Sequence, residues 1–131
     1  MMGGMSGYDA EKFEAEALAG DWKAAVAVLA RAHVRPEVLE ALMTPDAHLE
    51  VVLGVIGRSD VTPERMAWAA TFENAQILGR VVSNPKTPTS VIREIRSRVA
   101  DRDAPIWVHL REYADRVLAR VDRESGLHGG R

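Results

Sequence analysis

Side chains that could bind a metal or act in acid–base catalysis are few in this chain and are spread along it. The four histidines are His33, His48, His109 and His128. No two of them are three or four residues apart, the spacing that places two ligands on one helix face, and none belongs to a His-Glu-x-x-His motif. The histidines therefore predict no metal site, although His33 and His48 could still meet if their helices are adjacent.

Two carboxylates, Asp101 and Asp103, flank Arg102 just before the last expected helix. Such a pair could bind a cation or act as an acid and a base. Carboxylates at this place more often cap a helix and interact favourably with its positive end. We expect capping here.

Signatures of nucleophilic or cofactor chemistry are also missing from the sequence. There is no cysteine, which excludes disulfides, thiol catalysis and thiolate metal sites. No glycine-rich loop joins a strand to a helix, and no serine has a nucleophile-elbow context. We therefore expect a protein that is not an enzyme and holds no cofactor or metal.

The elements that would position any functional surface are marked by prolines. Threonine is a good N-cap, and proline suits the first helical position because its missing N–H would be unpaired there. This arrangement occurs at Thr44-Pro45, Thr62-Pro63 and Thr87-Pro88, and weaker helix starts occur at Arg35-Pro36 and Ala104-Pro105. Helical periodicity between these boundaries predicts helices over residues 9–19, 21–33, 36–43, 46–57, 63–70, 73–83, 88–100 and 105–124.

An internal repeat appears when the chain is shifted by 27 residues and then by 25. Four kinds of position then coincide in the same order. The apolar pairs are Ala25-Val26, Val52-Leu53 and Ile77-Leu78, and the small residues are Ala27, Gly54 and Gly79. The next apolar residues are Leu29, Ile56 and Val81, and the prolines are Pro36, Pro63 and Pro88. One helix pair cannot bury both of its apolar faces, whereas stacked copies can. The repeat predicts an all-α protein, a short α-solenoid of about four stacked helix pairs. It also predicts a close neighbour at each small residue.

One unit of this repeat resembles the leucine-rich repeat variant family. Residues 81–92, VVSNPKTPTSVI, carry an apolar helix end, an Asn-Pro turn, a Thr-Pro start and a short apolar helix. Residues 57–66 are similar without the Asn-Pro, and residues 32–39 are a weaker copy. The resemblance implies a right-handed stack of short helices, related to HEAT and armadillo repeats, that serves as an interaction scaffold with no shared catalytic residues. The cysteine cluster of some members has no counterpart here.

The repeat domain is expected to cover residues 9–125 as a single unit. Residues 1–8 are expected to be a flexible leader and residues 126–131 a disordered tail. The N-terminus has neither the basic start nor the apolar core of a signal peptide, and no apolar run approaches the ~20 residues of a membrane span. We expect a cytoplasmic protein that does not contact a membrane.

Charge is distributed unevenly around a formal net charge of −2. Residues 1–50 carry nine acidic and four basic side chains, and residues 51–131 carry ten acidic and thirteen basic ones. Six basic residues lie in the segment 80–102: Arg80, Lys86, Arg93, Arg96, Arg98 and Arg102. They could form a solvated helix surface or contact nucleic-acid phosphates. The low net charge argues against nucleic acid as the main partner.

The function that the sequence predicts is a protein-interaction or scaffold module without catalytic activity, with nucleic-acid binding through residues 80–102 as the alternative. Stacked helix pairs form an extended surface, and arginines at matching repeat positions would suit an acidic protein segment. The residues expected to contact a partner are Arg31, Arg58, Trp68, Arg80, Lys86, Arg93 and Arg96. Trp68 could instead fill the core together with Phe72. The amphipathic last helix also allows a homodimer.

Overall fold

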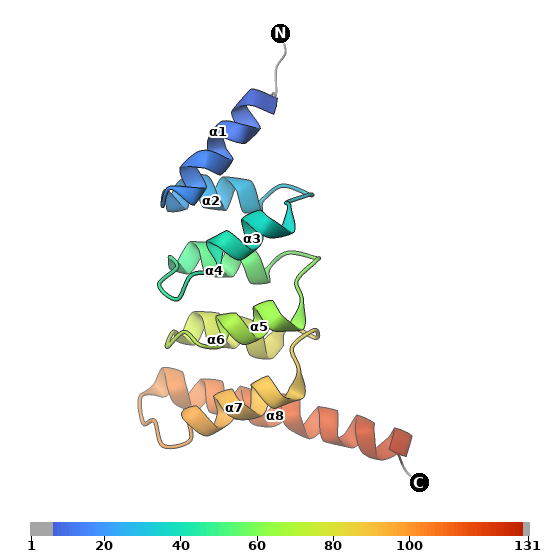
Figure 1. Cartoon of the computed structure of the whole chain (residues 1–131). Coiled ribbons are helices and arrows are strands. Elements are labelled where there is room, and N and C mark those ends of the chain that lie inside the picture. The colour runs from blue at the N-terminus through green and yellow to red at the C-terminus, as the bar shows by residue number, and fades with distance from the viewer. Residues whose placement is uncertain (1–6, 130–131) are drawn as a thin grey trace. The chain divides into compact units, whose positions relative to one another are not determined.

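The computed structural model describes the backbone of residues 7–129 and the side chains of residues 11–124. Over that range the chain forms eight helices and no strand (Figure 1). These are α1 (Gly7–Leu18), α2 (Trp22–Leu29), α3 (Pro36–Leu42), α4 (Leu49–Ile56), α5 (Pro63–Ala69), α6 (Ala75–Ser83), α7 (Thr89–Arg98) and α8 (Pro105–Gly129). Each expected helix has its counterpart, which confirms the all-α class. Within the described chain, none of the helices combines the length and the apolar character needed to cross a membrane.

The helices fall into two compact units. Unit 1 spans Met1–Asp60 and contains α1 to α4, and unit 2 spans Val61–Arg131 and contains α5 to α8. Helix α1 begins at Gly7, inside the expected leader, and α8 continues to Gly129, inside the expected tail. The rest of the expected leader and tail, residues 1–6 and 130–131, lies outside the described residues.

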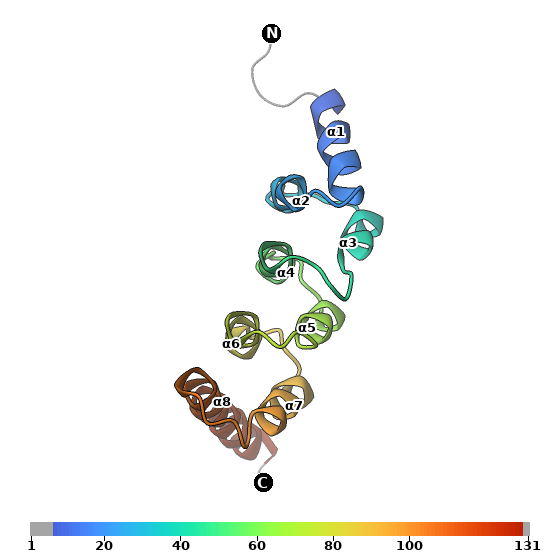
Figure 2. The same cartoon turned by 90° about the vertical axis from the view of Figure 1, so that its left-hand side faces the viewer.

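In unit 1, α2 packs against α1 and α4, and α1 packs against α3 (Figures 1 and 2). Val28, Val52 and Val55 have no exposed surface, so an aliphatic core forms as the low aromatic content requires. The sharp reversal between α1 and α2 depends on Gly20, which has a φ of +109° that other residues rarely adopt. The Gly20 N–H donates to Ala17 O and the Asp21 N–H to Glu16 O, the paired bonds of a Schellman motif.

In unit 2, α6 packs against α5, α7 and α8, and α7 also packs against α8. Leu78, Ile95 and Ala114 from three of these helices are fully buried. The last helix contributes its apolar stripe to this core, as Leu110, Val117 and Leu118 are less than one-tenth exposed. The stripe that could have served a homodimer is therefore largely used within unit 2.

Only one of the three Thr-Pro pairs begins a helix in the expected way. The Thr62 hydroxyl accepts a hydrogen bond from the Arg65 N–H at 3.3 Å, as an N-cap should. At Thr44-Pro45 the expectation is wrong, because α4 begins five residues after Thr44 and is capped by His48, whose Nδ1 accepts from the Glu50 N–H at 3.1 Å. The proline there lies in a turn.

At Thr87-Pro88 the expected cap is also wrong. The Thr87 side chain is buried and donates its hydroxyl to Val81 O at 2.6 Å. It therefore satisfies a carbonyl at the end of α6 instead of an N–H at the start of α7. Pro88 occupies the N-cap position of α7 and makes no side-chain hydrogen bond.

The recurring small residues do not share one packing role. A Cβ added at Gly54 would lie 3.0 Å from Leu29 Cδ1, so the predicted close neighbour is confirmed there. At Gly79 it would meet nothing within 4 Å, and Ala27 is exposed. The prediction is wrong at Gly79, because only the α2–α4 contact brings a side chain over the glycine.

Candidate interaction surface

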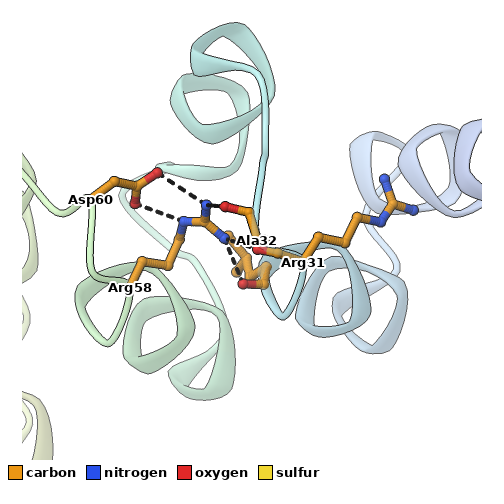
Figure 3. Close-up of polar contacts among 5 residues, drawn as sticks. Arg31, Ala32, Arg58 and Asp60 are labelled. Carbon is orange, nitrogen blue, oxygen red and sulfur yellow. Dashed lines mark hydrogen bonds and ion pairs between the residues drawn. The ribbon is translucent and has the colours of Figure 1, made fainter.

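The side chain of Arg58 connects the ends of α4 and α2 inside unit 1 (Figure 3). Its Nη1 donates to Leu29 O and to Arg31 O, both at 2.8 Å, and its Nη2 donates to Ala32 O at 3.3 Å. Asp60 completes the arrangement with contacts of 2.9 and 3.0 Å to the same guanidinium. Leu29 is the last residue of α2, and Arg31 and Ala32 follow its C-cap. Carbonyls at a helix C-terminus lack helical partners and carry partial negative charge.

The Arg58 side chain is only 7% exposed, so little of it is accessible to a partner. A cation at that depth is held by hydrogen bonds on several sides and contributes to the fold of unit 1. Arg31 extends away from the Arg58 guanidinium (Figure 3) and forms an ion pair with Glu14 of α1 at 3.4 Å. The two residues that the repeat aligns thus have different roles.

Glu14 binds a second cation, Arg35, at 2.7 Å. This hydrogen bond and the negative charge of Glu14 raise the pKa of the Arg35 guanidinium above its ordinary value. A raised pKa means that the pair stabilises the fold below that pKa and loses its effect only as the pH rises through it. That range lies far above neutrality, so the pair adds no pH dependence near pH 7.

Two further arginines in unit 2 use the same chemistry as Arg58. Arg98 donates to Ala70 O at the end of α5. Arg111 of α8 donates to Val99, Ala100 and Arg102 carbonyls beyond the end of α7, at 3.2, 2.9 and 3.2 Å. These roles were not predicted from the sequence. One sequence feature could have indicated them: Arg58 and Arg98 each lie 28 or 29 positions after the helix-end carbonyl to which they donate.

The remaining basic residues of segment 80–102 are mostly paired within unit 2. Arg93 contacts Asp122 at 3.0 Å, Arg96 contacts Asp115 at 2.5 Å, and Arg102 forms an ion pair with Glu73. Arg80 is exposed on α6, and its side chain makes no hydrogen bond or ion pair with the described residues. Lys86 is exposed in the turn before α7.

Trp68 of α5 is half-buried and packs edge-to-face against Phe72, with ring centroids 5.4 Å apart and planes at 84°. This is the packing with Phe72 that the core interpretation of Trp68 predicts. Large apolar side chains that stand exposed among the described residues are Leu18, Trp22 and Ile106.

Leu18 and Trp22 line an open hollow of about 410 Å³ in unit 1, which we call the Trp22 hollow. Its wall consists of Ala17, Leu18, Gly20, Trp22, Ala25, Ala41, Leu42, Thr44, Asp46, Ala47, His48 and Val51. Trp22 stacks on His48 with ring centroids 4.0 Å apart and planes at 1°. This hollow was not predicted from the sequence. The sequence feature that could have indicated it is a tryptophan at the first position of a helix, directly after an N-cap aspartate.

His128, one of the histidines considered for metal binding, lies outside the residues whose side chains are described. Among the described residues, no group of three His, Asp or Glu side chains could hold a metal ion. His33 is exposed, and His48 is engaged with Trp22 and with the start of α4. Asp101 and Asp103 are exposed and accept no hydrogen bond from the described residues, so the cap expected from them is not formed. The helix after them begins at Pro105, which has no N–H.

Comparisons of the chain with protein-family models, with curated proteins and with solved structures gave no match.

Proposed function

We propose that this chain is a non-catalytic protein-interaction module, built as a short α-solenoid of about four helix pairs similar to leucine-rich repeat variant or HEAT repeats. The repeated order of apolar pair, small residue and proline supports the solenoid. So does the packing inside each unit, where α2 lies against α4 and α6 lies against α8. Solenoids of this kind present surfaces rather than catalytic pockets.

The observation that carries the interaction function is the Trp22 hollow. Of the three large apolar side chains that are exposed among residues 11–124, two lie on this one hollow, Leu18 at 50% and Trp22 at 38%. Tryptophan is enriched among the residues that dominate binding energy, and an apolar concavity with polar surroundings is typical of partner sites. A second hollow of about 440 Å³ is lined by Arg31 and Arg58, whose guanidiniums are already bonded within unit 1. The second hollow therefore has fewer side-chain groups available to a partner than the Trp22 hollow.

The alternative, nucleic-acid binding through residues 80–102, receives less support. Phosphate contacts need available cations. Arg93, Arg96 and Arg102 are paired with carboxylates. Arg98 is directed to a backbone carbonyl.

The proposed function is tested by selecting a random peptide library displayed on phage against the immobilised full chain. We expect enriched peptides that share a side-chain pattern and bind the purified chain with micromolar Kd. Amide chemical-shift changes on binding would locate the site. If no peptide is enriched above the level of an unrelated helical protein immobilised in the same way, the interaction function is contradicted.

A further inference from the structure

We propose that the Trp22 hollow binds a basic protein segment that inserts an apolar side chain between Leu18 and Trp22. This inference rests on the proposed function and adds to it the site and the chemistry of the partner. It departs from the acidic segment that the arginines suggested.

The apolar part of the recognition comes from the walls of the hollow. Leu18 and Trp22 expose large apolar surface, and Ala25, Leu42 and Val51 continue that surface toward the buried core. Covering apolar surface with a side chain of the partner removes it from water, at roughly 25 cal/mol per Å². An aliphatic or aromatic side chain therefore fits the centre of the hollow.

The charged part comes from four exposed carboxylates on or directly next to wall residues. Asp46 lies on the wall, and Asp21, Glu40 and Glu50 adjoin Trp22, Ala41 and Val51 in sequence. None of the four forms an ion pair with the described residues. Lys23 is the cation beside them, and it lies over the Trp22 ring at 5.8 Å.

The starts of α2 and α4 also meet this hollow and reduce its negative charge. A helix N-terminus is equivalent to about half a positive charge. Two such ends and Lys23 offset about two of the four carboxylate charges, so a negative rim remains. The surrounding unit has the same sign, because residues 1–60 carry ten acidic and five basic side chains. Lysine and arginine on either side of the inserted side chain would complement this rim.

The walls are held in place before any partner arrives. Trp22 is stacked on His48 at 4.0 Å. His48 is itself fixed by the hydrogen bond from the Glu50 N–H to its Nδ1. At the start of α2, the Asp21 carboxylate accepts from the Lys23 and Ala24 N–H groups at 3.0 and 3.3 Å. A site that is already ordered loses less conformational entropy on binding, which favours affinity.

The test uses the full chain and three short labelled peptides measured by fluorescence anisotropy. The first peptide has a central Trp-Leu pair flanked by lysine and arginine. The second replaces the basic flanks with glutamate, and the third replaces the Trp-Leu pair with Gly-Ser. We expect the first to bind with micromolar Kd and the other two to bind at least about tenfold more weakly.

Variants then locate the site. Leu18→Ser and Trp22→Ala should each weaken binding of the first peptide about tenfold or more. Ile106→Ser, which changes an even more exposed apolar residue in unit 2, should leave the binding of the first peptide unchanged. Asp46→Asn combined with Glu50→Gln should weaken binding severalfold and flatten its salt dependence, whereas Glu94→Gln with Glu112→Gln should do neither.

The outcomes separate this inference from the proposed function. Peptides that bind equally to the wild type, Leu18→Ser and Trp22→Ala would overturn the site while leaving an interaction module. An acidic pattern among the phage-selected peptides would overturn the partner chemistry in the same way. Self-association in sedimentation that both Leu18→Ser and Ile106→Ser abolish would show that a second copy of the chain occupies the hollow, and would also overturn the inference. If no designed peptide binds and no peptide is selected from the library, both this inference and the proposed function are contradicted.

Discussion

The guanidinium of Arg58 and the carbonyl oxygen of Leu29 lie 2.8 Å apart, although 29 positions separate the two residues in the chain. The same guanidinium also donates to Arg31 O, which lies 27 positions earlier in the chain. One side chain thus links the end of one helix pair to the end of the next within unit 1. This contact joins two neighbouring helix pairs through backbone carbonyls at and beyond a helix end.

Arg58→Ala should destabilise unit 1 by about 2–4 kcal/mol. The change removes hydrogen bonds from a charged donor, each worth about 1.5–3 kcal/mol, and leaves the carbonyls at the end of α2 without that partner. Arg58→Lys should recover only part of the loss, because an ammonium group cannot reach several acceptors as a planar guanidinium does. Urea denaturation followed by circular dichroism measures the effect, and amide hydrogen exchange assigns it to unit 1.

The matched control is Arg80→Ala. Arg80 is exposed, and its side chain has no polar partner among the described residues, so its removal should change stability by less than about 0.5 kcal/mol. Equal losses for Arg58→Ala and Arg80→Ala would show that the Arg58 contacts contribute nothing specific to the fold.

Gly79→Ala and Gly54→Ala should differ in effect although both glycines occupy the same repeat position. Alanine is favoured over glycine inside a helix by about 1 kcal/mol. At Gly79 the added methyl group has open space, so the change should stabilise the protein by about 0.5–1 kcal/mol. At Gly54 it would lie 3.0 Å from Leu29 Cδ1, so the side chain of Leu29 must move.

We expect the free energy of unfolding of Gly54→Ala to be lower than that of Gly79→Ala by about 1 kcal/mol or more. Thermal and urea unfolding of the two variants, measured side by side with the wild type, provide the comparison. Equal stabilisation by both changes would mean that Leu29 moves without cost and that Gly54 has no packing role.

The helices could be predicted from the sequence because apolar spacing and prolines report local preferences. All eight expected helices overlap an observed one, and Arg35-Pro36, Thr62-Pro63 and Ala104-Pro105 mark helix starts correctly. The hydrogen-bond partner of each threonine hydroxyl could not be predicted in this way. A threonine hydroxyl can accept from an N–H ahead or donate to a carbonyl behind. The surrounding turn decides between them, and Thr62 and Thr87 take opposite choices.

The surface proposed to bind a partner was harder to predict than the helices, because a long charged side chain can form its contacts inside the molecule or face the solvent. Arg58 and Arg80 look alike in the sequence, yet one guanidinium is bonded to three carbonyls and the other is exposed. The difference depends on whether a neighbouring helix ends within reach. The Trp22 hollow could not be predicted for a similar reason, because residues from α1 to α4, which are separate in the sequence, together form its wall.

Thr87→Val should destabilise unit 2 by about 1 kcal/mol. Valine keeps the shape of the buried side chain but removes the hydroxyl that donates to Val81 O. The net loss stays near 1 kcal/mol because Val81 O also accepts from the Asn84 N–H at 3.2 Å and so remains partly satisfied. Thr87→Ser keeps the hydroxyl and serves as the control. If the serine variant were the less stable of the two, methyl packing rather than the hydrogen bond would be the main contribution of Thr87.

Nucleic-acid binding by the wild type should be weak, and freeing two arginines should strengthen it. Arg93 and Arg96 must give up Asp122 and Asp115 before they contact phosphates. Such exposed pairs are worth up to about 1 kcal/mol each, so their cost lowers affinity without forbidding binding. Titration of a labelled duplex and a labelled single strand at about 50 mM salt should give Kd values above the micromolar range and a shallow salt slope.

Asp115→Asn combined with Asp122→Asn should raise the affinity for nucleic acid severalfold and steepen the salt slope. The control, Glu94→Gln with Glu112→Gln, removes the same charge elsewhere in unit 2 and should raise the affinity less. Micromolar binding by the wild type with a steep salt slope would contradict this prediction and would favour the nucleic-acid alternative over the protein-interaction module.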